Sequence, residues 1–153
     1  MRSLMRKITV AKLDGCNFAS RATLESIIRM LHTHERVKVI VVSAPHLVTR
    51  HLQHLTDPLV PHPQHQQSLK YIDTLFTRIT AEMPPEVGQE IDYEGYISRI
   101  QQLHRAIYQK HSIELCEQLI AIGEQFYTDL FYNMLSFNGF NPKWIPATEL
   151  IAT

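Results

Sequence analysis

Three short stretches of the sequence carry residue types that can bind a small charged metabolite. Residues 12–17 (KLDGCN) follow an apolar run and place a lysine at an expected turn, and residues 43–49 (SAPHLVT) place two hydroxyls after a second apolar run. Farther along, Gly123 and Glu124 lie inside a long helical pattern. A lysine, hydroxyls and a carboxylate can together hold a molecule that has both anionic and cationic groups.

The first stretch lies where open α/β sheets bind anionic ligands, at the carboxyl end of a strand. There Lys12 can meet a phosphate as a point charge. A single Gly15 is a poor phosphate cradle, because the carboxylate of Asp14 repels the anion and its Cβ blocks a close approach to the backbone. On residue types alone, an ordinary turn from strand to helix is the simpler interpretation.

The other two stretches also have structural interpretations beside the functional ones. Ser43 and Thr49 can line a ligand, but they are equally ordinary as a strand-end hydroxyl and a helix-start residue. Inside a helix, Gly123 costs about 1 kcal/mol against Ala, which suggests a close approach to its backbone. Glu124 could then meet a cationic group of a ligand, or it could be an exposed carboxylate on a solvated helix face.

The elements that position these residues begin with a βαβ unit. Residues 8–11 and 37–42 are short β-branched runs, and the second is apolar enough for a strand of a parallel sheet. Ser20 precedes the helix between them as an N-cap. The apolar positions of that helix are Leu24, Ile27, Ile28 and Leu31.

Helical patterns fill most of the remaining chain. A short helix is predicted over residues 47–55, a proline-containing loop over 57–67 and a third strand at 144–145. Three amphipathic patterns lie between the loop and that strand, and Gly139 ends the last of them. Their apolar positions are Leu69, Ile72, Leu75, Phe76 and Ile79; Tyr96, Ile97, Ile100, Leu103 and Ile107; and Leu115, Leu119, Ile122, Phe126, Leu130, Phe131 and Met134.

The composition is that of an ordinary globular domain without a strongly charged face. The 153 residues are 44% hydrophobic and 20% charged, and 15 basic residues balance 15 acidic ones. This balance argues against a nucleic-acid or membrane partner. No apolar stretch approaches the roughly 20 residues that span a bilayer, and the start lacks the apolar run of a signal peptide. Cys16 and Cys116 fit neither a disulfide framework nor a zinc site, so a cytoplasmic protein is expected.

Histidines are dense in one segment of the chain. Of the nine, five lie within residues 46–65. Imidazole binds zinc, copper and nickel, but His51 and His54 are three residues apart without the carboxylate base of a zinc-protease helix. Solvated histidines are the simpler interpretation, and no metal site is predicted.

Taken in order, the polar stretches resemble motifs of the aspartokinase branch of the amino-acid kinase family. Residues 12–17 stand where that family has Lys-Phe-Gly-Gly-Thr/Ser-Ser. Residues 41–44 (VVSA), followed by Thr49, resemble its second strand and the loop after it. Residues 122–124 (IGE) resemble its Gly-Glu helix, and residues 139–153 resemble the strand that follows.

The resemblance implies a three-layer α/β/α fold of the amino-acid-kinase type. Residues 1–153 would form a single domain similar to the N-terminal half of an aspartokinase catalytic domain. Its truncated, mostly parallel sheet would have about three strands, and residues from about 65 to 112 would form a helical insertion.

Aspartokinases use ATP and Mg²⁺ to phosphorylate the side-chain carboxylate of L-aspartate, at the entry to lysine, threonine and methionine synthesis. By this resemblance, Lys12 is a catalytic residue that contacts the transferred phosphoryl group. Ser43 and Thr49 would line the aspartate pocket, and Glu124 would hold the α-ammonium group. The phosphate loop would comprise Gly15, Cys16 and Asn17.

Several positions depart from the family pattern. Asp14 replaces a glycine of the phosphate loop, and Cys16 and Asn17 replace hydroxyl residues. Leu47 replaces a glycine, and Tyr127 replaces a serine. The family's nucleotide-binding half is expected to be missing, so this chain alone is not expected to bind ATP and Mg²⁺ or to act as a kinase.

Two functions remain open on these grounds. The chain could be an aspartate kinase module completed by a second chain that carries the nucleotide half. It could instead be a non-catalytic relic that binds a small amino acid or a protein partner. A narrow sheet would leave an open edge and an uncovered apolar face, so a homodimer or a complex with a complementing chain is predicted.

Overall fold

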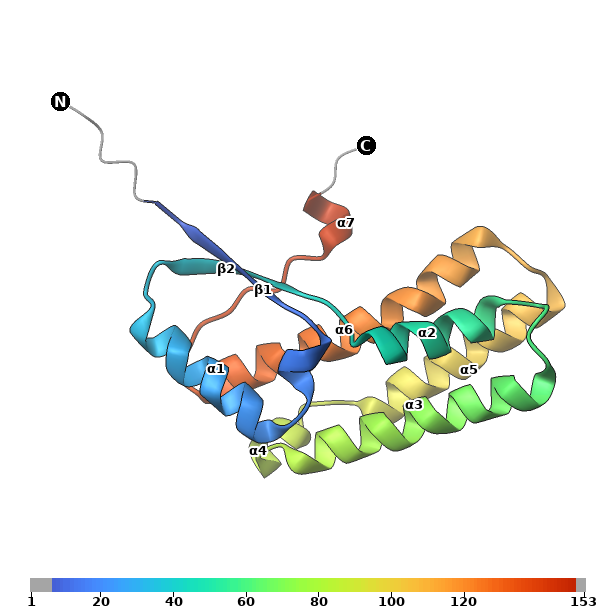
Figure 1. Ribbon diagram of the computed structural model, residues 1–153, viewed down its shortest axis with the longest axis horizontal. Helices are drawn as coiled ribbons and strands as arrows, with labels where there is room; N and C mark the ends of the chain where they lie inside the picture. Colours follow the sequence, from blue (N-terminus) through green and yellow to red (C-terminus); the bar gives the residue numbers. More distant parts are fainter. Residues whose placement is uncertain (1–6, 151–153) are drawn as a thin grey trace.

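The computed structural model describes residues 7–150, which form a small parallel sheet beside a mostly helical body (Figure 1). No helix in this part of the chain is long and apolar enough to cross a membrane. The elements follow in the order β1 (Thr9–Leu13), η1 (Gly15–Phe18), α1 (Arg21–Thr33), β2 (Val37–Val42), α2 (His46–Thr56), α3 (His62–Glu82), α4 (Pro85–Gly88), α5 (Tyr93–Gln109), α6 (Ile113–Phe137) and α7 (Ala147–Leu150).

The predicted strand-helix-strand unit at the start of the chain is confirmed. Strands β1 and β2 pair in parallel, with Leu13 opposite Val42, and α1 connects them. Ser20 caps α1 as predicted, because its side chain accepts a hydrogen bond from the backbone N–H of Thr23 at 3.2 Å. The sheet and its connecting helix therefore follow from local sequence signals.

The third strand predicted at residues 144–145 is not formed. The sheet of the described residues has two strands, and residues 141–146 have no regular secondary structure. Pro142 and Pro146 flank the predicted strand. Since proline offers no N–H to a ladder and restricts the residue before it, too few residues remain between them to pair as a strand.

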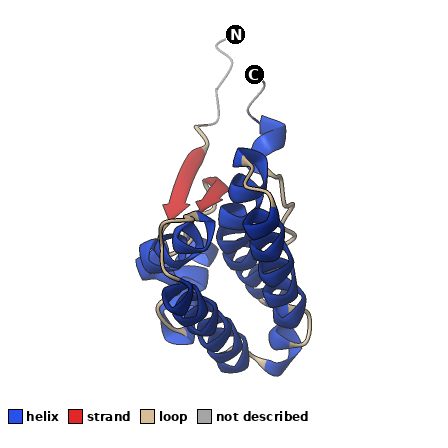
Figure 2. Ribbon diagram, turned by 90° about the vertical axis from the view of Figure 1, so that its right-hand side faces the viewer, coloured by secondary structure: helices blue, strands red, loops and turns tan. Residues whose placement is uncertain are grey.

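Helices cover only one face of this sheet, so the predicted three-layer arrangement is absent from the described residues. Leu13 faces the helices and is buried, whereas Val10, Val39 and Val41 on the outer face are 61%, 46% and 47% exposed. Figure 2 shows the two strands above the bundled helices. The outer face carries these valines together with the exposed Lys12, which pairs with Val41, and it has no covering layer among the described residues.

The amphipathic patterns are confirmed as helices, while the loop prediction is wrong in its second half. α2 covers residues 47–55, and the three longer patterns form α3, α5 and α6. α3 already begins at His62, between Pro61 and Pro63. Proline is tolerated in the first turn of a helix because N–H groups there have no intrahelical partner. α3 to α5 lie in the range of the predicted helical insertion, whose limits stay a prediction.

The central element of the core is α6. It packs against α2 and α5, and its Phe126 stacks on Phe76 of α3 with ring centroids 3.7 Å apart. Gly139 follows the helix with a φ of 86°, a left-handed conformation that favours glycine. This confirms the predicted end of the helix. The fully buried side chains of α6 include Leu119, Ile122, Phe126, Tyr127 and Leu130.

Candidate functional site

The carboxyl ends of β1 and β2 meet at one edge of the sheet. The backbone N–H of Ser43 donates a hydrogen bond to the carbonyl of Leu13 at 3.0 Å, just beyond β2. The loop after β1 then packs directly on the loop after β2, because a Cβ on Gly15 would lie only 2.3 Å from Cα of Pro45. Only glycine fits this contact. In Figure 1 the place lies where β1 ends beside the start of α2.

The long helix α6 reaches the same place through Gly123. A Cβ on Gly123 would lie 3.0 Å from Cδ1 of Leu52 and 3.3 Å from Cβ of Ala44. The close approach predicted for this helix backbone is therefore confirmed, and the approaching groups are α2 and the loop after β2. Glu124 is the next residue of α6 and is exposed. We call the contact region of Gly15, Ala44, Pro45 and Gly123 the junction.

The junction brings the three polar stretches together through their backbones. Thr49 lies in the first part of α2, and its N–H donates to the carbonyl of Pro45 at 3.1 Å. Lys12 and Glu124 both have exposed side chains. Among the described residues the ion pairs are Arg21 with Glu25 and Arg78 with Glu82. Lys12 and Glu124 therefore do not form an ion pair with each other.

Two backbone N–H groups of the predicted phosphate loop, those of Cys16 and Asn17, already donate hydrogen bonds to Asp14. The carboxylate of Asp14 caps η1 by accepting from the N–H of Cys16 at 3.2 Å. In return, the N–H of Asp14 donates to Oδ1 of Asn17 at 2.8 Å, and the N–H of Asn17 donates to the carbonyl of Asp14 at 3.0 Å. A phosphate would have to displace these bonds and meet a carboxylate at the same time. Beyond its charge, Asp14 therefore competes for the donors that a phosphate needs.

Tyr127 of α6 supports this loop from the core side. Its ring is fully buried and meets Phe18 of η1 edge-on, with ring centroids 5.0 Å apart. The hydroxyl has no hydrogen-bond partner within residues 7–150. Burial is the main reason why the pKa of Tyr127 lies well above its ordinary value. Tyr127 thus packs beneath the loop, and its hydroxyl does not reach the surface of the loop where a ligand would bind.

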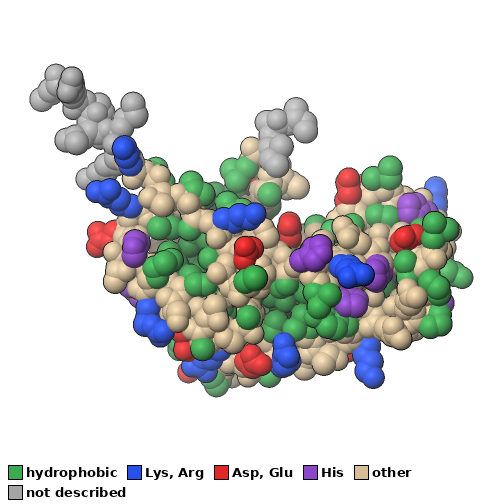
Figure 3. Space-filling model, in the orientation of Figure 1, with side chains coloured by type: hydrophobic (Ala, Val, Ile, Leu, Met, Phe, Trp, Pro, Cys, Tyr) green, Lys and Arg blue, Asp and Glu red, His purple; other side chains and the backbone are tan. Residues whose placement is uncertain are grey.

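Several histidines gather over the α2 region on one face of the molecule (Figure 3), but they divide into separate contacts. Nδ1 of His51 lies 2.9 Å from Oγ of Ser68, and its ring stacks on Tyr71. His65 of α3 and His104 of α5 are buried and share a hydrogen bond of 3.0 Å. Burial, and then neighbouring positive groups, lower the pKa of His51 and of His104. No group of three or more metal-ligating side chains is placed to hold an ion in the described chain.

Sequence reasoning missed two polar contacts between helices. One is the pair His65 and His104, which lie 39 residues apart and outside a common motif. The other is Asp129 of α6, which accepts from the hydroxyl of Tyr96 at 3.0 Å and from the side-chain amide of Asn133 at 2.9 Å. Burial raises the pKa of Asp129. The spacing of Asp129 and Asn133 by four residues is the one local signal for this contact.

The parallel strand pair and its helices define an aspartokinase-like α/β fold. Escherichia coli aspartokinase III in complex with lysine and aspartate (T-state) aligns with a TM-score of 0.75 and 24% identity, over 88% of this chain and 30% of that one. The same enzyme in complex with aspartate and ADP (R-state) aligns with the same score and identity, over 90% and 31%. No protein-family model matches the chain, and a search of curated proteins finds no match.

These comparisons establish the fold and not the roles of individual residues. The chain spans less than a third of the length of the structures that it matches. The site roles therefore stay predictions for Lys12, Ser43, Thr49 and Glu124.

Proposed function

We propose that the chain binds a small acidic amino acid, with L-aspartate as the first candidate, at the junction. The observation that carries this proposal is the close packing of Gly15 on Pro45 and of Gly123 on Ala44, which gathers the three polar stretches at one sheet edge. Both E. coli aspartokinase III structures are complexes with aspartate, which adds support. Ligands of open α/β sheets bind at this kind of edge.

The charges of the junction residues complement those of an amino acid. Glu124 would accept hydrogen bonds from the α-ammonium group, because its carboxylate is exposed and has no ion-pair partner among the described residues. Lys12 would meet a carboxylate of the ligand as a point charge. Ser43 and Thr49 would add hydroxyl hydrogen bonds from the end of β2 and the start of α2.

We further propose that the isolated chain does not transfer a phosphoryl group. The support is the loop after β1, where the carboxylate of Asp14 occupies the N–H of Cys16. A nucleotide phosphate would compete with Asp14 for the N–H groups of Cys16 and Asn17 and would also meet the negative charge of that cap.

The test is a calorimetric titration of the whole chain with L-aspartate, in the wild type and in Glu124→Ala. Loss of a charge-assisted contact should weaken binding about tenfold or more. Glu117→Ala is a matched control, because Glu117 is an exposed residue of the same helix away from the junction. Its affinity should equal that of the wild type. If aspartate does not bind, or if both variants bind equally well, the proposed site is wrong.

Phosphoryl transfer is tested separately by release of ADP from ATP and L-aspartate. We expect the wild-type chain to show no more release than Lys12→Ala. Activity that exceeds that of Lys12→Ala would overturn the non-catalytic part of the proposal while leaving amino-acid binding intact. In that case the chain, or the chain with a complementing partner, would be an aspartate kinase module.

A second candidate function, protein interaction, is favoured by the outer face of the sheet. Val10, Val39 and Val41 form an exposed apolar surface next to two unpaired strand edges, and such surfaces are typical of interfaces. A homodimer or a complementing chain would cover it. Light scattering should show a dimer that Val39→Ser weakens. A wild-type monomer at high concentration would exclude the homodimer, and the complementing chain would remain as the proposed partner.

A further inference from the structure

A half-open cavity lies on the other side of β2 from the exposed sheet face. It has a volume of about 490 Å³ and is lined by the end of α1 and the loop after it, β2, the second half of α6 and residues 140–144. Val42, Phe131 and Leu135 form an apolar inner wall. Small-molecule sites commonly have volumes of roughly 300–1,000 Å³ and largely apolar walls, so the cavity has the size and lining of a binding site.

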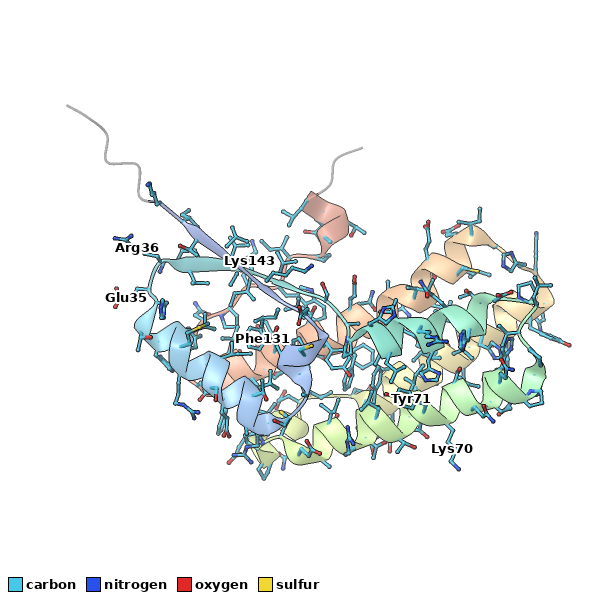
Figure 4. All side chains as sticks on the ribbon, in the orientation of Figure 1. Glu35, Arg36, Lys70, Tyr71, Phe131 and Lys143 are labelled. Atoms are coloured by element: carbon cyan, nitrogen blue, oxygen red, sulfur yellow. The ribbon has the colours of Figure 1, made fainter. Side chains whose placement is uncertain are left out.

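The cavity lining carries positive charge. Lys38 reaches it from β2 and Lys143 from the segment after α6. Both side chains are exposed, and neither forms an ion pair within the described part of the chain. Glu35 is the single carboxylate in the lining, so the two lysines leave a net positive charge. Figure 4 shows Lys143 on the segment that leads toward α7 and Phe131 on α6.

Flat rings form another part of the wall. His32 stacks on Phe140 with ring centroids 4.5 Å apart and planes 28° apart, and both line the cavity. Trp144 lines it too and remains 38% exposed. Stacked and partly exposed rings favour a planar apolar group in the space beside them.

We propose that this cavity binds a small aromatic carboxylate. Its ring would lie against Phe131 and Phe140, and its carboxylate would lie between Lys38 and Lys143. A lining with an apolar wall and cationic groups complements a molecule that has one apolar end and one anionic end. The proposal does not rest on aspartate binding at the junction, since none of Lys12, Ser43, Thr49 and Glu124 lines the cavity.

Trp144 offers a direct measurement because it is the single tryptophan of the sequence. The whole chain is titrated with 4-phenylbutyrate, which hardly absorbs at the red edge of tryptophan excitation, and Trp144 fluorescence is recorded. We expect a saturable change. The uncharged amide of the same compound should bind more weakly, because it lacks the charge that the lysines meet.

Variants identify the residues responsible for binding. Lys38→Gln and Lys143→Gln should each weaken binding roughly two- to fivefold, the range for an exposed charge pair. Lys70→Gln is the matched control, since Lys70 lies on α3 outside the cavity lining (Figure 4). Phe140→Ala should also weaken binding, and because Phe140 also packs against the core, its folding is checked by circular dichroism before the titration.

Three outcomes would overturn the proposal. The first is the absence of a saturable change up to the solubility of the acid. The second is equal affinity for the acid and its amide. The third is loss of binding in Val39→Ser but not in Lys143→Gln, which would place the probe on the outer face of the sheet.

Discussion

The two ends of the molecule are built differently. At the helical end, formed by α2, α3, α5 and the part of α6 against them, rings stack in the core and side chains join one helix to another, as Phe76 does with Phe126 and His65 with His104. At the sheet end, Val10 and Val39 are exposed and Lys12 has no ion-pair partner among the described residues. Stability therefore resides mainly in the helical end, while the sheet end holds the surfaces available for binding.

The largest expected contrast comes from one truncation at each end. Phe76→Ala should lower the free energy of unfolding by about 3–5 kcal/mol, because it removes a fully buried ring and leaves a cavity beside Phe126. Val39→Ser on the outer sheet face should change it by about 0.5 kcal/mol or less. Urea unfolding followed by circular dichroism measures both. A loss above about 2 kcal/mol in Val39→Ser would mean that the outer face is covered.

The contact between the two ends is tested at Gly123. Gly123→Val should lower the free energy of unfolding by about 1–3 kcal/mol, because its side chain would collide with Leu52 and Ala44. Gln118→Val, at an exposed position of the same helix, should lose only about 0.6 kcal/mol from helix propensity. The difference between the two variants measures the tightness of the junction in the same urea experiment. Equal losses would mean that α6 does not pack closely against α2.

The elements were predictable where the signal is local. The helical stripes, the cap at Ser20 and the glycine that ends α6 depend on residues within a few positions of one another, and the structure has them as predicted. The early start of α3 differs from the predicted loop because proline signals a loop in sequence, although the first turn of a helix accepts it. The third strand was predicted from the apolar residues Trp144 and Ile145, but it does not form. Here the prolines on both sides prevent pairing, and the sequence pattern gave them too little weight.

The candidate site was predictable only in its residue types. The sequence indicated which stretches are polar, and Gly123 indicated a close approach, but nothing local identified Pro45 or Ala44 as the groups approached. The sequence shows that Asp14 is negatively charged and would repel a phosphate. It does not show that the same carboxylate also caps η1 by accepting from the N–H of Cys16. The link from His65 to His104 depends on folding of segments far apart and left no pattern to detect.

The helical end should also respond to acid. Nε2 of His65 faces the carbonyl of Asp57, so it carries the hydrogen, and Nδ1 then accepts from Nε2–H of His104. Because the pKa values of His51 and His104 are lowered in the fold, the unfolded chain binds more protons below about pH 6.5. Stability is therefore fully present above that pH and falls as the pH falls, by at most about 1.4 kcal/mol per pH unit for each proton.

Urea unfolding between pH 7 and about pH 5 measures this slope. His104→Gln keeps a donor toward His65 but cannot be protonated, so its slope should be smaller than that of the wild type. His46→Gln, at an exposed position of α2, should leave the slope unchanged. The same slope in wild type and His104→Gln would remove His104 as a cause of the pH dependence.

The smallest expected effect lies where the two ends meet, at Tyr127. Its buried hydroxyl has no partner in the described part of the chain, so Tyr127→Phe should keep the ring contact with Phe18 and raise the free energy of unfolding by roughly 1 kcal/mol. Tyr108→Phe, at an exposed position, should change it little. A thermal melt of the three proteins measures the difference. If Tyr127→Phe is less stable than the wild type, the hydroxyl has a bonding partner, and the loop around η1 is held by a polar contact instead of by packing alone.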